Sequence, residues 1–340
     1  MTPIDKRRLG RSGLVVSRLT LGTMTFGDRT DATEAQRIVD AAADIGVNFI
    51  DTADAYAKGA SESIVGRAIR DRRHEWILAT KAGNEVVGRP WEGGLSRRWL
   101  LQACDDSLER LGTDWIDVYY LHRDDPATPL AETIGAIGDL IASGRIRYFG
   151  VSNFRGWRIA ALVAECERQN VPPPVVCQPY YNLLNRMPEV EILPACDHYG
   201  IGVASYSPVA RGVLTGKYVP GAAPPADSRG ALKDQRMMET EFREESFAIA
   251  QTLKRHAERT GRTITSFALA WLWANPILTS VIAGPRTLEQ WRDYERSIGA
   301  AWSDEDEALV DSLVRPGHPS TPGYSDPRYP FYGRRRMPAG

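Results

Sequence analysis

The chain has 340 residues, of which 43% are hydrophobic and 25% charged, the composition of a globular protein. Its formal net charge of −1 gives no electrostatic reason to expect a nucleic acid or an anionic membrane as a partner. The sequence has no apolar run of about 18 residues that would predict a membrane helix, and no secretory signal at its N-terminus. The four cysteines show neither a C-x-x-C motif nor metal-ligand spacing, so we expect a cytoplasmic protein with reduced thiols and no metal.

Strand and helix patterns alternate along most of the chain. Residues 7–16 turn at Gly10 and Gly13, which predicts an N-terminal β-hairpin. From residue 19 onward, short apolar runs alternate with segments whose apolar residues recur at helical spacing. Strands are predicted around Leu19, Phe49, Ile77, Val118, Phe149, Val176, Val203 and Val281. Helices are predicted at 33–45, 61–71, 97–111, 129–143, 157–169, 189–199, 244–259, 263–274 and 287–299.

Eight strand–helix units with no change of composition predict an α/β protein whose fold is a single closed (β/α)8 TIM barrel. We expect one domain over residues 1–340, with its core at about 7–314. A short extra helix capped by Ser303 ends the core, and an irregular C-terminal tail, residues 315–340, follows. The glycine- and proline-rich segment 209–240, after the seventh strand, is too long for an ordinary connection and predicts a functional loop.

A doubly wound sheet is the alternative fold for such a pattern. That fold normally binds nucleotides through a G-x-G-x-x-G turn between a strand and a helix. The candidate Gly10-Arg-Ser-Gly13 neither completes this motif nor joins a strand to a helix. The barrel is therefore favoured.

Four reactive residue types fall at the predicted C-terminal ends of three consecutive strands, where barrel enzymes carry their active sites. They are Asp51, Tyr56, Lys81 and His122. Singly, each has a structural explanation, since a lone lysine at a strand end is usually solvated and a single histidine is more often structural than catalytic. Together they form a chemical set. A lysine beside a phenol favours the phenolate, a carboxylate orients the lysine, and a neutral histidine can hydrogen-bond the carbonyl oxygen that the phenol protonates. Since no Ser–His nucleophile or metal cluster accompanies them, the missing reactant is expected to be a hydride from a cofactor.

The motif Asp51-Thr-Ala-x-x-Tyr56, with Lys81 and Leu121-His122, resembles the catalytic tetrad of the aldo-keto reductase superfamily, and the similarity covers about residues 7–314. Further matching stretches lie at 21–27, 150–154, 178–182, 206–218 and 282–284. The resemblance implies an NADPH-preferring oxidoreductase, or NADP-dependent alcohol dehydrogenase, that acts on an aldehyde or ketone without a metal. It implies that Tyr56 is the general acid, that Lys81 and Asp51 tune it, and that His122 orients the carbonyl.

The same resemblance implies a cofactor site. Ser152, Asn153 and Gln178 would bond the nicotinamide carboxamide, and Tyr206 would stack on the ring. The pyrophosphate would lie along residues 207–217 and the adenosine end near 284–294, where an arginine opens the last strand–helix loop. The full implied set is Gly22, Thr23, Met24, Asp51, Ser152, Asn153, Gln178, Tyr206, Ser207, Pro208, Ala210, Gly212, Lys217, Gly284, Arg286, Gln290 and Tyr294.

Tyr294 departs from the family pattern, which commonly has an asparagine at that position in contact with adenine. Adenine recognition could there become stacking, or Tyr294 could simply pack on its helix. The sequence therefore leaves open whether the protein prefers NADP(H) or NAD(H).

Aromatic residues near the predicted barrel mouth suggest an apolar or ring-containing carbonyl or alcohol as the small-molecule substrate. The expected substrate contacts are Phe26, Tyr56, Trp91, His122 and Phe154, with Met24, the loop after Pro208 and the tail residues Tyr324, Tyr329, Phe331 and Tyr332 as further candidates. The protein is expected to be a monomer or a homo-oligomer. A second hypothesis is a cofactor-binding regulatory or scaffold subunit, like the potassium-channel β subunits of this architecture, and a third, a metal-dependent barrel hydrolase, lacks ligands.

Overall fold

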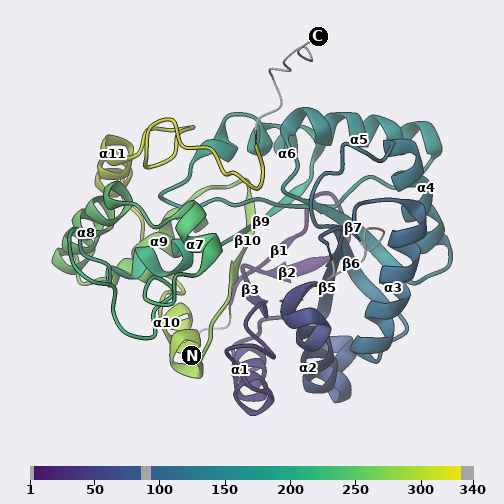
Figure 1. Ribbon diagram of the computed structural model, residues 1–340, viewed down its shortest axis with the longest axis horizontal. Helices are drawn as coiled ribbons and strands as arrows, with labels where there is room; N and C mark the ends of the chain where they lie inside the picture. Colours follow the sequence, from purple (N-terminus) through teal and green to yellow (C-terminus); the bar gives the residue numbers. More distant parts are fainter. Residues whose placement is uncertain (1–3, 86–92, 331–340) are drawn as a thin grey trace, which may run out of the picture.

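The computed structural model, which describes residues 4–85 and 93–330, has a closed barrel of parallel strands at its centre (Figure 1). Within the described residues, eight strands follow the order β10-β3-β4-β5-β6-β7-β8-β9 around the barrel. Their bounds are β3 Leu19–Gly22, β4 Phe49–Asp51, β5 Ile77–Ala82, β6 Ile116–Leu121, β7 Ile146–Ser152, β8 Val176–Gln178, β9 Gly202–Tyr206 and β10 Leu278–Ala283. The predicted (β/α)8 barrel, with all of its predicted strands, is confirmed.

Helices form the outer layer of the barrel (Figure 1). Those that follow single strands are α1 Ala32–Asp44, α2 Ala60–Ile69, α3 Arg97–Leu111, α4 Leu130–Ala142, α5 Gly156–Gln169, α6 Ile192–Tyr199 and α10 Leu288–Arg296. The long connection after β9 contains the 3-10 turn η4 Ala210–Thr215, then α7 Gln235–Thr240, α8 Glu244–Arg259 and α9 Ile264–Ala274. The additional helix α11 covers Asp304–Leu313. Of the described residues, no helix is long and apolar enough to cross a bilayer.

Polar caps explain where several of these helices begin and end. The Ser96 Oγ accepts a hydrogen bond from the Trp99 amide N at 3.3 Å and starts α3. Ser303 and Asp306 form a reciprocal capping box that starts α11. Gly112 closes α3 in the left-handed conformation that glycine adopts without strain. These boundaries are the ones that the sequence pattern predicts.

An N-terminal hairpin closes the barrel at the end opposite the predicted reactive residues. Its strands are β1 Lys6–Arg8 and β2 Val15–Ser17. Leu9 and Val16 are completely buried against the apolar side chains inside the barrel. A Cβ on Gly10 would lie 2.6 Å from the Gly200 carbonyl O, so only glycine fits where the hairpin turn meets the barrel. The open end of the barrel is therefore the C-terminal end of its strands.

The C-terminal tail folds back over this open end as far as the structure describes it. Arg236 of α7 and Asp326 of the tail form a two-pronged ion pair, with N–O distances of 2.9 and 2.5 Å. Arg155 donates from its guanidinium to the Tyr329 carbonyl O at 2.7 Å. The tail is thus anchored both to the long loop after β9 and to the start of α5.

Candidate active site

The four residues predicted to act together lie at the C-terminal ends of three neighbouring strands. Asp51 ends β4, Lys81 lies near the end of β5, and His122 directly follows β6. Tyr56 begins η1 (Tyr56–Gly59), and its ring meets the His122 ring edge-on with centroids 5.9 Å apart. Because β4, β5 and β6 are consecutive in the barrel, the structure brings these side chains into one cluster.

Lys81 is the centre of this cluster and is completely buried. Its Nζ donates to Asp51 Oδ2 at 2.6 Å, to the Thr52 carbonyl O at 2.7 Å and to Tyr56 Oη at 3.2 Å. Gln178 Nε2 donates to the other carboxylate oxygen of Asp51 at 2.8 Å. Burial alone would lower the pKa of Lys81, but Asp51 and Tyr56 outweigh it and raise the pKa, so the ammonium stays charged.

The balance of effects on Tyr56 differs from the expectation that Lys81 makes it more acidic. Burial raises the pKa of Tyr56, and this exceeds the lowering that the Lys81 charge produces. The nearby Asp51 carboxylate adds to the increase. The net shift of the pKa is therefore upward, because desolvation of a phenolate outweighs one neighbouring cation. The phenol keeps its proton at neutral pH, which suits a proton donor.

His122 is a neutral hydrogen-bond donor in this environment. Burial, followed by the charges of Lys81, Arg328 and Arg123, holds the pKa of His122 well below its usual value. Its Nδ1 lies 2.9 Å from Asn84 Nδ2, and the Arg328 guanidinium contacts Asn84 Oδ1 at 3.5 Å. Since an arginine can only donate, Asn84 presents its oxygen to Arg328 and its N–H to the ring. His122 therefore accepts at Nδ1 and carries its proton on Nε2.

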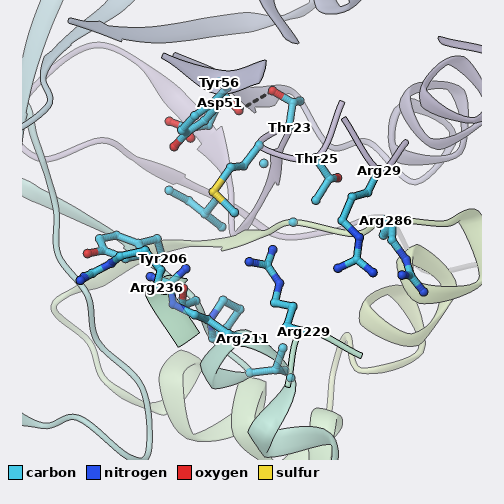
Figure 2. Close-up of a pocket in the computed structure, with 18 of the residues that line it drawn as sticks. Thr23, Thr25, Arg29, Asp51, Tyr56, Tyr206, Arg211, Arg229, Arg236 and Arg286 are labelled. Atoms are coloured by element: carbon cyan, nitrogen blue, oxygen red, sulfur yellow. Dashed lines mark hydrogen bonds between the residues drawn. The ribbon is translucent and has the colours of Figure 1, made fainter. Parts of the chain in front are cut away.

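A cavity of about 600 Å³ opens beside this cluster, and Figure 2 shows Tyr56 on one side of it and Tyr206 on the other. Tyr206 Oη donates to Asn153 Oδ1 at 2.8 Å, and Asn153 Nδ2 donates to the His122 carbonyl O at 2.9 Å. Asn153 and Ser207 both have positive φ, 58° and 57°, although neither is glycine. Strained backbone of this kind is typical of binding sites.

Arg29, Lys217 and Arg286 form a cationic cluster at one end of the cavity. Arg29 and Arg286 lie near each other (Figure 2), and both guanidinium groups donate to the Asp227 carbonyl O, at 2.9 and 3.4 Å. Burial lowers the pKa of Lys217, and the charges of Arg286, Arg229 and Arg29 lower it further. No carboxylate in residues 4–85 and 93–330 pairs with a member of the cluster. Uncompensated cations at such density fit a polyanionic ligand.

Most residues predicted to bind the cofactor line this one cavity. They are Gly22, Thr23, Met24, Asp51, Ser152, Asn153, Gln178, Tyr206, Ser207, Pro208, Gly212, Lys217, Gly284, Arg286, Gln290 and Tyr294. Ala210 is fully buried in η4 and is not among the residues that line the cavity. Tyr294 is buried but reaches the cavity.

The residues predicted to contact the substrate do not all lie at the same cavity. Tyr56 and His122 line the main cavity, whereas Phe26 lies in the hydrophobic core with no exposed surface, so its predicted contact is not supported. Phe154 lines a separate, smaller cavity of about 80 Å³. Trp91 lies outside the described residues.

The tail residues predicted to line the pocket also lie at different cavities or outside the described residues. Tyr329 lines both cavities, and Tyr324 lines the smaller one. Phe331 and Tyr332 lie outside the described residues. Several further residues that the sequence did not single out line the main cavity: Thr25, Arg29, Asn84, Arg211, Arg229, Arg236 and Arg328. Arg211, Arg229 and Arg236 lie in the long segment 209–240 that the sequence marks as a functional loop, and this was the signal that could have indicated them.

Asp54 is a buried carboxyl group next to the tetrad, and neither of its oxygens has a hydrogen-bond partner among the described residues. Burial, aided by the Glu62 carboxylate, raises its pKa to about 8. Between about pH 4 and pH 8 the native state then holds a proton that the unfolded state has lost, so stability falls as pH rises, by up to about 1.4 kcal/mol per unit. We expect Asp54→Asn to flatten this fall, measured as urea unfolding free energy across that pH range.

The exposed Asp28→Asn change serves as the control for Asp54, and it should leave the pH dependence of stability as it is in the wild type. If the unfolding free energies of the wild type and Asp54→Asn changed in parallel from pH 5 to pH 8, Asp54 would not be the group that causes the pH dependence of stability.

The fold and the site define a (β/α)8-barrel protein with a tyrosine–lysine–aspartate–histidine cluster at its open end. The model of the aldo/keto reductase family matches residues 18–315. The chain therefore belongs to the aldo/keto reductase family, as the resemblance in its sequence implied.

Relatives of the chain carry two kinds of name. A probable voltage-gated potassium channel subunit beta of Oryza sativa subsp. japonica is 39% identical over 284 residues, which cover 82% of this chain and 86% of the relative. An uncharacterized oxidoreductase of Bacillus subtilis is 37% identical, with 93% and 98% covered. An L-glyceraldehyde 3-phosphate reductase of Escherichia coli K12 is 32% identical, with 92% of both chains covered. The family and the relatives named as oxidoreductases support an oxidoreductase.

Proposed function

We propose that the protein is an NADP(H)-dependent oxidoreductase that interconverts an aldehyde or ketone with its alcohol, and that Tyr56 is its general acid and base. The observation that carries this proposal is the contact of Tyr56 Oη with the buried Lys81 Nζ at 3.2 Å, at the wall of a cavity that His122 also lines. A phenol, an ammonium and a neutral imidazole that lie together at a cavity wall are suited to stabilise the negative charge that develops on a substrate oxygen.

The cavity fits a nicotinamide coenzyme by its donor set. The cationic cluster offers three positive side chains without carboxylate partners in the described part of the chain, which suits phosphate groups. Ser152, Asn153 and Gln178 form a polar wall beside Tyr206, suited to an amide and a flat ring. A bound nicotinamide coenzyme would supply or accept the hydride. Tyr294 and Gln290 would lie at the adenosine end.

The chain's own groups provide the proton chemistry. In reduction, Tyr56 Oη gives its proton to the oxygen of the substrate, while the Nε2–H of His122 donates a hydrogen bond to the same oxygen. The phenolate left on Tyr56 is stabilised by the Lys81 ammonium, which Asp51 holds in place at 2.6 Å. In alcohol oxidation the same groups act in reverse order.

The direct experiment is to follow NADPH oxidation with purified protein and a panel of aldehydes and ketones. The panel includes L-glyceraldehyde 3-phosphate, because one relative is named for its reduction. Turnover of any member above the rate without protein supports the proposal. A complete lack of turnover, with NADPH bound, would reject it.

A second candidate function is a coenzyme-binding regulatory subunit, and it is favoured by the relatives named as potassium channel subunits. The intact contacts around Lys81 support the enzyme instead. The two functions differ in a simple measurement: a regulatory subunit retains NADPH tightly and turns over no carbonyl compound.

We expect Arg286→Leu to raise the KM for NADPH by about tenfold or more while changing the KM for NADH much less, because this guanidinium belongs to the cationic cluster. Arg292→Leu is the matched control, since Arg292 pairs with Glu295 and does not line the cavity. If Arg286→Leu changed the KM for NADPH and for NADH equally, Arg286 would not bind the 2′-phosphate that distinguishes NADPH from NADH. The ratio of the two KM values in the wild type would show whether the protein prefers NADPH with Tyr294 at the adenosine end.

A further inference from the structure

Arg328 is a cation at the catalytic cavity that the proposed proton chemistry does not use. It belongs to the C-terminal tail, is exposed, and lines the cavity together with Tyr56 and His122. Its guanidinium contacts Asn84 Oδ1 at 3.5 Å, and Asn84 Nδ2 in turn lies 2.9 Å from His122 Nδ1. A single amide side chain therefore separates Arg328 from the histidine.

The backbone at Arg328 is held in place by the rest of the tail. Asp326 accepts hydrogen bonds from Arg236 at 2.9 and 2.5 Å and from the backbone N–H of Arg328 at 2.9 Å. On the other side, Arg155 donates to the Tyr329 carbonyl O at 2.7 Å. The Arg328 side chain thus extends from an anchored turn, which limits the entropy lost when it binds a ligand.

No carboxylate within the described residues neutralises the Arg328 guanidinium. The carboxylate of Asp326 is engaged by Arg236. Glu85 also lines the cavity, but its side chain is 85% exposed and pairs at 4.0 Å with Arg123. An arginine placed at a cavity without an acidic partner is suited to bind a carboxylate or phosphate through two N–H groups.

We propose that the substrate is a carbonyl compound that carries a carboxylate or phosphate group, and that Arg328 binds this anion while the carbonyl oxygen lies between Tyr56 and His122. This inference rests on the proposed function, since it requires a carbonyl at that position. The cationic cluster is a separate site, because Arg29 and Arg286 lie on the side of the cavity away from Tyr206 (Figure 2).

The test compares charged and neutral aldehydes of similar shape, with the full chain and NADPH. The pairs are 4-carboxybenzaldehyde with methyl 4-formylbenzoate, and glycolaldehyde phosphate with glycolaldehyde. We expect the wild type to have a higher kcat/KM for the charged member of at least one pair, and Arg328→Met to lower that charged-to-neutral ratio by about tenfold or more. Arg328→Lys should retain part of the preference and Arg328→Glu should reverse it. The pair that responds identifies the anion as carboxylate or phosphate.

Arg315→Met is the matched control, because Arg315 is an exposed arginine of the same tail that does not line the cavity. Titration of benzoate into protein saturated with NADP⁺ gives a second readout, and Arg328→Met should weaken this binding while Arg315→Met should not. Unchanged ratios and unchanged benzoate binding in Arg328→Met would overturn the anion site. Arg328-dependent benzoate binding without turnover of any aldehyde would support the anion site and reject the proposed function.

Discussion

Replacing Tyr56 with phenylalanine is expected to lower kcat for carbonyl reduction by about 10²- to 10⁴-fold, the range typical of a lost general acid. The change removes only the Oη that contacts Lys81 Nζ at 3.2 Å and leaves the ring beside His122. The coenzyme should still bind, because Tyr56 lies away from the cationic cluster (Figure 2). The measurement is the rate of NADPH oxidation at saturating aldehyde, together with the change in protein fluorescence on NADPH binding.

Tyr199→Phe is the matched control for this experiment, since Tyr199 ends α6 and does not line the cavity. Its turnover should equal that of the wild type. If Tyr56→Phe also reduced aldehydes at the wild-type rate, Tyr56 could not be the proton donor, and the assignment of the whole cluster would fail with it.

Replacing Lys81 with methionine is expected to abolish turnover and also to lower the free energy of unfolding by about 3–5 kcal/mol. Lys81 and Asp51 are both buried and lie 2.6 Å apart, so the change leaves an uncompensated carboxylate inside the barrel mouth. The phenolate of Tyr56 would also lose the cation that contacts its oxygen at 3.2 Å. Urea unfolding and the aldehyde assay measure the two effects separately.

The double change Lys81→Met with Asp51→Asn distinguishes the structural effect from the chemical one. Removing the orphaned charge should restore part of the stability, whereas turnover should remain absent. Lys254→Met is the surface control: Lys254 pairs with Glu258 at 3.9 Å on an exposed helix face, and the loss should be under about 1 kcal/mol. A double variant as unstable as Lys81→Met alone would contradict the role given to the buried pair.

The fold followed from the sequence because its signals are local and repeated. Most residues of the barrel strands are buried, and even the three-residue strands β4 and β8 are recognisable between two predicted helices. The position of the residues proposed to be catalytic followed from the same pattern, since the C-terminal ends of neighbouring parallel strands meet at one end of a barrel. Once eight strands were assigned, Asp51, Lys81 and His122 had to lie close together.

The side-chain direction of Phe26 could not be predicted from the strand pattern, because the chain turns locally after β3. Met24 and Phe26 are two residues apart, so a simple strand pattern would place both side chains on the same side. Instead the chain turns after β3, where the Phe26 N–H donates to the Thr23 carbonyl O at 3.0 Å. Met24 consequently reaches the cavity with 40% of its surface exposed, while Phe26 is fully buried.

Arg328 and the acidity of Tyr56 could not be predicted for a different reason. The position of Arg328 depends on contacts between segments far apart in the chain, such as the ion pair of Arg236 with Asp326. The pKa of Tyr56 depends on the depth of burial, which outweighs the charge of Lys81. Neither long-range contacts nor burial can be read from the spacing of residues.

The central claim is that this protein transfers a hydride between NADP(H) and a carbonyl carbon, and isotopic labelling tests it most directly. The wild type and Tyr56→Phe would each be incubated with NADPH deuterated at the transferable C4 position and a reducible aldehyde, and the alcohol product examined by mass spectrometry and NMR. We predict one deuterium on the carbinol carbon in the wild-type product, and at least a hundredfold less labelled alcohol from Tyr56→Phe in the same time. Alcohol without deuterium, or no alcohol at all with every aldehyde in the panel, would contradict the claim.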